Sequence, residues 1–316
     1  MTKDFLGIEI GGTKLQLGIS AGDGSKFTAF ERRDIDISKG ATGILAQIEE
    51  AGKKLLAAYP VQRIGVGFGG PVDSERGCVI KSHQVAGWDD VPLGSWCEEK
   101  FGVPTVLGND CDCAALAEAL FGAGQGSRTV FYVTVGTGIG GGLVIGGRLH
   151  GKGRPAVAEI GHLRPGLSAD TPVATVESYA AGPAIVDAAE RLLESSDDEA
   201  AKSELRHCKM ESVLTAKILA NLAATGNSIA KSALFQSTCV LGWAIAQVIT
   251  ITAADVVVVG GGVSLIGEER FFQPLRCEVA RYVFPPVAKA YRILPAALGE
   301  DVVVHGAIAL AKATSR

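Results

Sequence analysis

The sequence lacks the cysteine patterns that mark disulfide-stabilised or zinc-binding proteins. Its seven cysteines include no C-x-x-C pair and are scattered along the chain, at positions 78, 97, 111, 113, 208, 239 and 277. An odd number of dispersed cysteines indicates reduced thiols in an intracellular protein. Cys111 and Cys113 stand on either side of Asp112 with no second pair nearby, so two small, partly buried thiols are favoured over a metal site there.

An excess of basic residues is also missing. The chain has 30 lysines and arginines against 34 aspartates and glutamates, a net charge of −4. Proteins that bind nucleic acid usually show a basic excess or a basic stripe. We therefore expect neither a nucleic acid nor a membrane surface as a partner.

Two further absences concern membranes and export. The first residues, MTKDFLGIEIGGTK, contain no long apolar run of the kind found in secretory signals. The uncharged stretch from Ser232 to Ala254 could mimic a membrane span, but it contains Gln236 and Gln247. A strand-like run of valines follows it directly, so a buried central helix is the better interpretation. These features predict a cytoplasmic protein.

Glycine, in contrast, is abundant. The chain has 41 glycines in 316 residues, where a typical composition of ~7 % would give about 22. No Gly-X-Y period accompanies them, which excludes a collagen-like protein. At roughly 150 residues per domain, a chain of this length is expected to form two domains or one large one.

The glycines gather in two stretches that alternate apolar residues at the period of a strand, turn at glycine, and alternate again. These are FLGIEIGGTKLQLGIS, residues 5–20, and VFYVTVGTGIGGGLVIGGRL, residues 130–149. With one inserted residue the first can be laid over the second. This weak repeat predicts two structurally similar lobes.

Between and after the hairpins, strands alternate with helices, a pattern typical of layered α/β proteins. Strands are expected at 26–33, 63–70, 104–110, 255–262 and 291–294, and helices at 41–59, 93–101, 111–122, 177–194, 211–224, 228–253, 268–284 and 303–313. The polar segment 195–204 is expected to be a solvated loop or helix surface.

Three glycine turns carry polar residues: GGTK (11–14), TVGTG (134–138) and GGGVS (260–264). Glycine after a strand lets backbone N–H groups approach a phosphate closely. The alternative is that glycine supports positive φ in tight hairpins. None of the turns matches the P-loop, and the G-x-G-x-x-G from Gly136 to Gly141 leads into a strand rather than the helix of a dinucleotide-binding unit.

The ordered series IEIGGTK, GGPVD, GW, ND, TVGTGIGGG, AEIGH, VES and GGGVS resembles the ROK family of sugar kinases and sugar-responsive repressors, from Phe5 to about Ala311. The resemblance implies the actin-like (ribonuclease-H-like) ATPase fold, with two α/β lobes around a central cleft. We expect a smaller N-terminal lobe at 1–115, with a C-terminal helix at about 303–316 packing back on it, and a larger lobe at 116–302.

The resemblance also implies a sugar site. Asp110 would be the base that accepts the proton of the attacking hydroxyl, and Asn109 a sugar ligand, although both residues are also good helix caps. The other sugar contacts implied are Gly70, Glu159, His162 and Glu177. For Glu159 and His162 the alternative is an ordinary polar loop.

Nucleotide contacts are implied at the three polar glycine turns, namely at Gly11, Gly12, Thr13, Lys14, Thr137, Gly138, Gly261 and Gly262. Glu9 occupies a position where the family usually has aspartate near Mg²⁺, so it would act on the metal through a water. An exposed glutamate without a role is the alternative.

Two further departures from the family pattern bear on the sugar. Many members place three cysteines between the positions of His162 and Glu177 to bind a structural zinc, and this chain has none there, so we predict no zinc. In SHQVAGW (82–88), Gln84 and Val85 replace a common Asn-Leu pair.

These features predict an ATP- and Mg²⁺-dependent kinase that phosphorylates a hexose or an N-acetylhexosamine, at the 6-hydroxyl. The alternative is a sugar-binding sensor of the family with weak or no kinase activity. A DNA-binding repressor is not expected, because only four residues precede the first strand. Homodimers are the family's habit.

Overall fold

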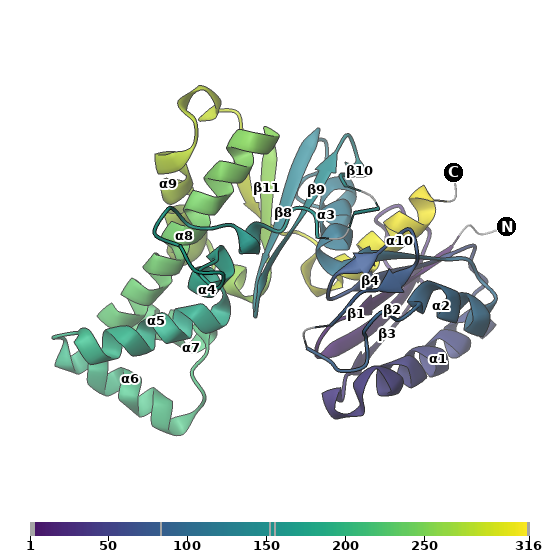
Figure 1. Ribbon diagram of the computed structural model, residues 1–316, viewed down its shortest axis with the longest axis horizontal. Helices are drawn as coiled ribbons and strands as arrows, with labels where there is room; N and C mark the ends of the chain where they lie inside the picture. The colour runs from purple at the N-terminus through teal and green to yellow at the C-terminus, as the bar shows by residue number, and fades with distance from the viewer. Residues whose placement is uncertain (1–3, 83, 152, 155, 315–316) are drawn as a thin grey trace. The chain divides into compact units, whose positions relative to one another are not determined.

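The computed structural model describes residues 4–82, 84–151, 153–154 and 156–314 (Figure 1). The chain forms two compact units. Unit 1 comprises Met1–Tyr132, Gly142–Ala158 and Ala296–Arg316, and unit 2 comprises Val133–Gly141 and Glu159–Pro295. The lobe boundaries expected from the sequence, after residues 115 and 302, stay a prediction.

Unit 1 is built on a five-stranded sheet of order β3-β2-β1-β4-β7. The first hairpin supplies β1 (Phe5–Ile10) and β2 (Lys14–Ser20), which pair antiparallel, and β3 (Ala29–Asp34) pairs antiparallel with β2. β4 (Ile64–Phe68) and β7 (Thr105–Asn109) extend the sheet in parallel. The carboxyl ends of β1, β4 and β7 therefore meet at one edge.

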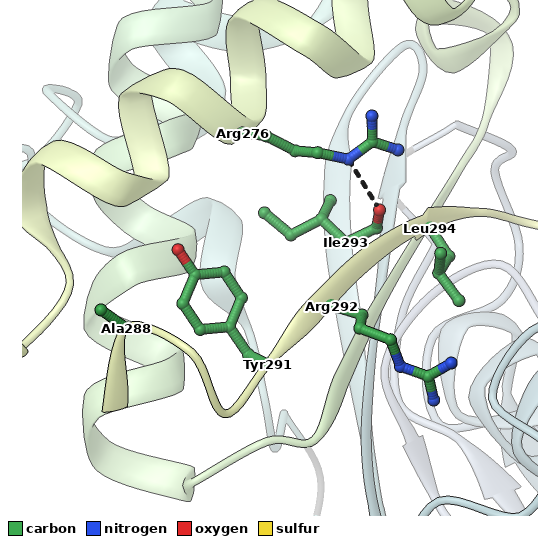
Figure 2. Close-up of a pocket in the computed structure, with 6 residues that line it drawn as sticks. All are labelled: Arg276, Ala288, Tyr291, Arg292, Ile293 and Leu294. Carbon is green, nitrogen blue, oxygen red and sulfur yellow. Dashed lines mark hydrogen bonds between the residues drawn. The ribbon is translucent and has the colours of Figure 1, made fainter. Parts of the chain in front are cut away.

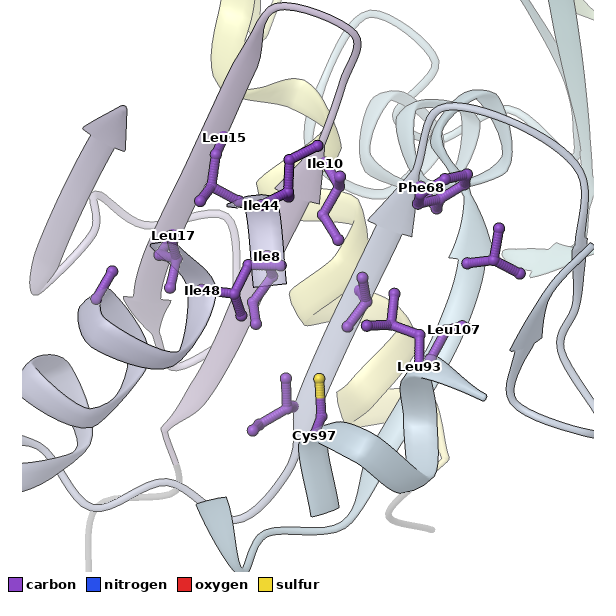
Figure 3. Packing of buried hydrophobic residues seen from close by; sticks show 14 of the residues in the cluster. Ile8, Ile10, Leu15, Leu17, Ile44, Ile48, Phe68, Leu93, Cys97 and Leu107 are labelled. Atoms are coloured by element: carbon purple, nitrogen blue, oxygen red, sulfur yellow. The ribbon is translucent and has the colours of Figure 1, made fainter. Parts of the chain in front are cut away.

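Helices cover both faces of this sheet. On one face lie α1 (Gly40–Ala58) and α2 (Leu93–Phe101), and Figure 3 shows Ile44 and Ile48 of α1 directed at Ile8 and Leu17 of the strands. The other face is covered by α10 (Val302–Ala313), which packs on β1, β4 and α3 (Asp110–Phe121). Strands buried on both faces read as nearly continuous apolar runs. All six residues of β1 are buried, and Glu9 is the one charged residue among them.

Glycine permits the close approach of α10 to its neighbours. A β-carbon at Gly65 of β4 would lie 1.9 Å from the carbonyl oxygen of Ala307, and one at Gly306 of α10 would lie 1.8 Å from that of Cys113. Both obstacles are backbone atoms, so a larger residue would push the helix away from the sheet and from α3.

A second five-stranded sheet has the order β10-β9-β8-β11-β12, and its strands are divided between the two units. The second hairpin supplies β8 (Thr129–Val135) and β9 (Ile139–Ile145), followed by the short β10 (Arg148–Leu149). β11 (Val256–Gly260) and β12 (Arg292–Pro295) pair in parallel. The two sheets have the same strand order. In each, the two strands of the hairpin lie between an edge strand on one side and two later strands on the other, as the repeat in the sequence predicts.

The helices of unit 2 start and stop at recognisable residues. Thr215 caps α7 (Ala216–Thr225) by accepting from the N–H of Ile218, and Gly226 ends that helix in the left-handed conformation. The remaining helices are α4 (Val176–Ala180), α5 (Gly182–Ser195), α6 (Glu199–Glu211), α8 (Ser228–Thr252) and α9 (Gln273–Tyr282).

Among the described residues, α8 is the one helix long and apolar enough to cross a membrane by length and composition. It packs against α5, α7 and α9 (Figure 1), and 56 % of its most apolar window is buried. A core helix passes the same test, and the burial agrees with the interpretation drawn from its sequence.

Most expected elements are present, with some differences. The segment 195–204, expected to be a loop or helix surface, contributes to α6, and the helix expected at 211–224 starts only at Ala216. The helix expected at 177–194 is two helices, because the chain is extended at Ala181 and α5 starts anew at Gly182-Pro183. The helix expected at 268–284 begins with a π-helical turn, Glu268–Phe272. A small hairpin of β5 (Val72–Asp73) and β6 (Cys78–Val79) was not expected.

Candidate functional site

The turn between β1 and β2 carries four of the expected nucleotide residues. It is closed by a hydrogen bond from the N–H of Gly11 to the carbonyl of Lys14, at 3.0 Å. Neither Gly11 nor Gly12 has a positive φ. A β-carbon at Gly12 would instead lie 1.5 Å from Oε1 of Gln84, so a larger residue there would require the Gln84 side chain to move. Gln84, noted in the sequence as a departure near the sugar motifs, thus lies over the expected nucleotide turn.

Lys14 is held by contacts within unit 1. Its Nζ lies 3.2 Å from Oε1 of Glu9 and donates to the carbonyl of Glu300 at 3.0 Å. The Gln16 side chain, with its amide nitrogen facing Glu9, donates to Glu9 Oε2 and to the same carbonyl. The ammonium group is therefore fixed at the end of β1.

Glu9 is buried, with 5 % of its surface exposed. Burial raises the pKa of Glu9 to about 7, and the nearby Lys14 ammonium opposes this only in part. Asp110 and Asp301 add to the rise in pKa through their negative charges. Both carboxylate oxygens of Glu9 already have partners in Lys14 and Gln16.

Glu9 does not fit the role of a direct magnesium ligand in this arrangement. Mg²⁺ requires near-octahedral oxygen ligands, and a cation at Glu9 would have to displace Lys14. No group of three or more His, Cys, Asp or Glu side chains that could hold a metal is found in the part of the chain that the structure describes. That Glu9 acts on Mg²⁺ through a water molecule stays a prediction. The expected absence of zinc also stays a prediction.

Asn109 and Asp110 lie where β7 ends and α3 begins. Asn109 caps α3, because its Oδ1 accepts from the N–H of Cys111 at 2.8 Å, and its Nδ2 donates to the carbonyl of Gly70 at 2.9 Å. Asn109 is therefore a helix cap. Its side chain also forms a hydrogen bond with Gly70, another residue expected to bind sugar. An amide nitrogen has two protons, so one remains for a ligand.

Asp110 is partly exposed, and its Oδ1 accepts from the N–H of Cys111 at 2.8 Å. Burial raises the pKa of Asp110, while this hydrogen bond acts in the opposite direction. A β-carbon at Gly69 would lie 3.5 Å from Asp110 Oδ2, so the carboxylate reaches the loop that follows β4. A carboxylate with a raised pKa, at the carboxyl end of a strand, is suited to accept a proton.

Cys111 and Cys113 are both buried in α3. Burial raises the pKa of the Cys113 thiol well above its usual range. The burial of both side chains agrees with the small thiols favoured from the sequence.

The remaining expected sugar residues lie in unit 2. Glu159 precedes the short helix η2 (Ile160–His162), and Glu177 lies in the first turn of α4, which packs against η2. The N–H of Val176 donates to the carbonyl of Leu163 at 2.9 Å, which joins the two segments. The AEIGH and VES motifs are therefore neighbours.

The expected nucleotide residues of unit 2 lie on two adjacent turns. Thr137 is exposed at the tip of the turn between β8 and β9, where the N–H of Gly136 donates to the carbonyl of Gly138 at 2.9 Å. Gly261 follows β11 with φ of 85°, and a β-carbon there would lie 2.5 Å from the carbonyl of Val135. Gly262 opens the next short helix, η3 (Gly262–Ile266), with space around its α-carbon.

A pocket of about 420 Å³ in unit 2 lies apart in sequence from all of these residues. Its lining is Arg276, Ala288, Tyr291, Arg292, Ile293 and Leu294. The Arg276 guanidinium is paired with Glu268 and donates to the carbonyl of Ile293 at 3.0 Å, and Figure 2 shows Arg292 extending away from it. The two arginines do not converge on a ligand.

Comparison with known proteins identifies the family and the fold of the chain. The chain matches the ROK family over residues 5–314. A glucokinase of Halalkalibacterium halodurans is 30 % identical, covering 96 % of this chain and 93 % of its own. A ROK family glucokinase from Streptomyces griseus, solved in complex with glucose and AMPPNP, is 30 % identical with a TM-score of 0.80, covering 98 % of this chain and 99 % of its own.

The ROK hexokinase from Thermus thermophilus is 28 % identical, with a TM-score of 0.80, and the match covers 99 % of both chains. These similarities confirm the actin-like α/β ATPase fold that the sequence predicts. The chain belongs to the ROK family.

Proposed function

We propose that this protein is a carbohydrate kinase that transfers the γ-phosphoryl group of ATP to a hydroxyl of a hexose or an N-acetylhexosamine, at the 6-position. The observation that carries the proposal is the placement of Asp110. Its carboxylate stands at the carboxyl end of β7 beside Asn109, which is tied to Gly70. The S. griseus relative of the same fold was solved with a sugar and an ATP analogue.

In the reaction, Asp110 accepts the proton of the attacking hydroxyl as the oxygen bonds to phosphorus. Burial raises its pKa, so its affinity for that proton exceeds that of an ordinary aspartate. The remaining amide proton of Asn109 is available to a neighbouring sugar oxygen. Further hydroxyls of the sugar would be held by Glu159, His162 and Glu177. Each carboxylate can accept from two neighbouring hydroxyls, and the imidazole can donate or accept a hydrogen bond.

The nucleotide would be held by backbone N–H groups of the glycine turns and by Lys14. A triphosphate brings Mg²⁺ with it, and the metal keeps most of its ligands as phosphate oxygens and water. Glu9 then serves to hold Lys14 in place through their 3.2 Å ion pair.

Release of ADP measured over a panel of hexoses and N-acetylhexosamines tests this function. Asp110→Asn keeps the shape of the side chain but cannot take the proton, so turnover should fall about 10²–10⁴-fold while sugar binding survives. Wild-type activity should fall as the pH drops through the folded-state pKa of Asp110, which lies above 3.8. Normal turnover in the variant would remove Asp110 from this role.

A second candidate function is favoured by Glu9, whose two oxygens are occupied at a position where the family usually has aspartate. In this case the protein would bind sugar as a sensor with weak or no kinase activity. Calorimetric binding of a sugar, without release of ADP in the presence of the same sugar, would identify it.

We further propose that the protein acts in the cytoplasm as a homodimer. The odd number of scattered cysteines supports the location. The homodimer follows the habit of the family, and sedimentation equilibrium measures it.

A further inference from the structure

The turn between β8 and β9, residues 134–139, contacts every segment of unit 2 that carries an expected site residue. The most specific contact is made by Glu177, whose Oε2 accepts from the backbone N–H of Ile139 at 2.7 Å. The same oxygen lies 2.6 Å from where a β-carbon on Gly138 would stand. A residue expected to bind sugar is thus bonded to the expected nucleotide turn.

The other contacts leave this turn little freedom. A β-carbon at Gly161, within the AEIGH motif, would lie 2.1 Å from the carbonyl oxygen of Ile139. The peptide groups of Ile139 are therefore approached on one side by Glu177 and on the other by η2. The N–H of Gly182, at the start of α5, donates to the carbonyl of Gly136 at 2.7 Å.

The position of Glu177 is itself well fixed. α4 begins with a capping box in which Thr175 accepts from the N–H of Ser178 while the Ser178 hydroxyl accepts from the N–H of Thr175. Glu177 lies within that turn, and its side chain is partly buried. The carboxylate cannot leave Ile139 without bending this helix start or changing rotamer.

We propose that Glu177 is a positioning residue for the nucleotide turn as well as a contact of the sugar. Its Oε2 fixes Ile139, and through it Thr137 and Gly138, while its other oxygen is available to a sugar hydroxyl. The proposal rests on the proposed function and deepens it. Glu177 therefore holds the nucleotide turn in its place before either substrate binds.

The test is the affinity for AMPPNP measured by calorimetry in the absence of sugar. A residue that only contacts sugar would not alter this affinity. Glu177→Ala removes a charge-assisted hydrogen bond to a backbone N–H, and it should weaken nucleotide binding about tenfold or more. Glu177→Gln keeps an oxygen that can accept from Ile139, so its loss should be smaller.

His162→Ala is the matched control, because His162 is an expected sugar contact on the neighbouring segment. Its affinity for AMPPNP without sugar should equal that of the wild type. Equal affinity in Glu177→Ala and the wild type would overturn the inference and leave the proposed function standing. Equal weakening in Glu177→Ala and His162→Ala would overturn it too, whereas no binding by the wild type would overturn the proposed function itself.

Gly138→Ala keeps the test decisive if Glu177→Ala does not fold. The added β-carbon would lie 2.6 Å from Glu177 Oε2 and force the carboxylate off its bond. As a single change, Gly138→Ala should weaken nucleotide binding. Added to Glu177→Gln, whose bond to Ile139 is already weaker, it should cause a smaller loss of affinity. Unchanged nucleotide affinity in Gly138→Ala would overturn the inference.

Discussion

The carboxylate of Glu118 holds together two parts of unit 1 that are distant in sequence, and its loss should destabilise the unit measurably. Glu118 lies on α3 and is fully buried. Its Oε1 accepts from the N–H groups of Ala297 and Leu298, each at 2.9 Å, and its Oε2 accepts from the N–H of Ala123 at 2.8 Å. It thus anchors the segment where the chain re-enters unit 1 before α10.

The size of the effect follows from these three bonds. A hydrogen bond to a charged group contributes about 1.5–3 kcal/mol. In Glu118→Gln one carboxylate oxygen becomes an NH₂ group that faces an N–H donor, so at least one bond is lost and the others weaken. We expect a loss of about 2–4 kcal/mol for Glu118→Gln and about 4–5 kcal/mol for Glu118→Ala, which leaves three partly buried N–H donors without this partner.

Urea unfolding followed by tryptophan fluorescence measures this loss. Two of the three tryptophans, Trp88 and Trp96, lie in unit 1, so a Trp243→Phe background reports on that unit alone. This matters because a chain of two units can unfold in more than one step. Glu99→Gln, at an exposed position of α2, is the control and should change stability by less than about 0.5 kcal/mol.

A Glu118→Gln variant within about 0.5 kcal/mol of the wild type would refute this reasoning. The hydrogen bonds of Glu118 also affect the candidate site. They hold Leu298, which lies two residues before Glu300, and the carbonyl of Glu300 accepts from Lys14. Loosening Glu118 should therefore raise the nucleotide KM before it affects sugar binding.

Two further predictions concern the turn between β1 and β2. Gly12→Ala would place a β-carbon 1.5 Å from Gln84 Oε1, so we expect a several-fold higher nucleotide KM, restored by adding Gln84→Ala; an unchanged KM in the single variant would show that Gln84 moves freely. Glu9→Gln removes the anionic partner of Lys14 and should lower turnover and raise the Mg²⁺ requirement, with unchanged sugar affinity in the absence of nucleotide. Higher turnover in Glu9→Asp would favour the sensor function, and unchanged Mg²⁺ dependence in both variants would remove Glu9 from the metal's surroundings.

Local patterns in the sequence predict the helices and strands well, because the formation of helices and strands depends largely on neighbouring residues. The alternation in residues 5–20 predicts β1 and β2, and the apolar spacing of α2 predicts its bounds, Leu93–Phe101. The break at Ala181 had a local signal as well, since Gly182-Pro183 favours a new helix start. Asp110 could be placed at a strand end for the same reason.

The contacts that join the motifs could not be predicted in this way. The bond from Ile139 to Glu177 spans 38 residues, and the bonds from residues 297–298 to Glu118 span about 180. Each depends on how whole elements pack, which no spacing in the sequence specifies. A glycine inside AEIGH was the one visible hint that η2 approaches another backbone closely.

The glycine excess has two physical causes, and separating them bears on the site. Some turns need glycine for a positive φ, as at Gly146 and Gly147, with φ of 57° and 74°. Gly12 and Gly138 have no such need, and a β-carbon there would meet the ends of the Gln84 and Glu177 side chains. Those ends can move, so glycine is required at these two positions only if Gln84 and Glu177 keep their present placement. For Glu177 that placement is the hydrogen bond to the N–H of Ile139, which holds the nucleotide turn.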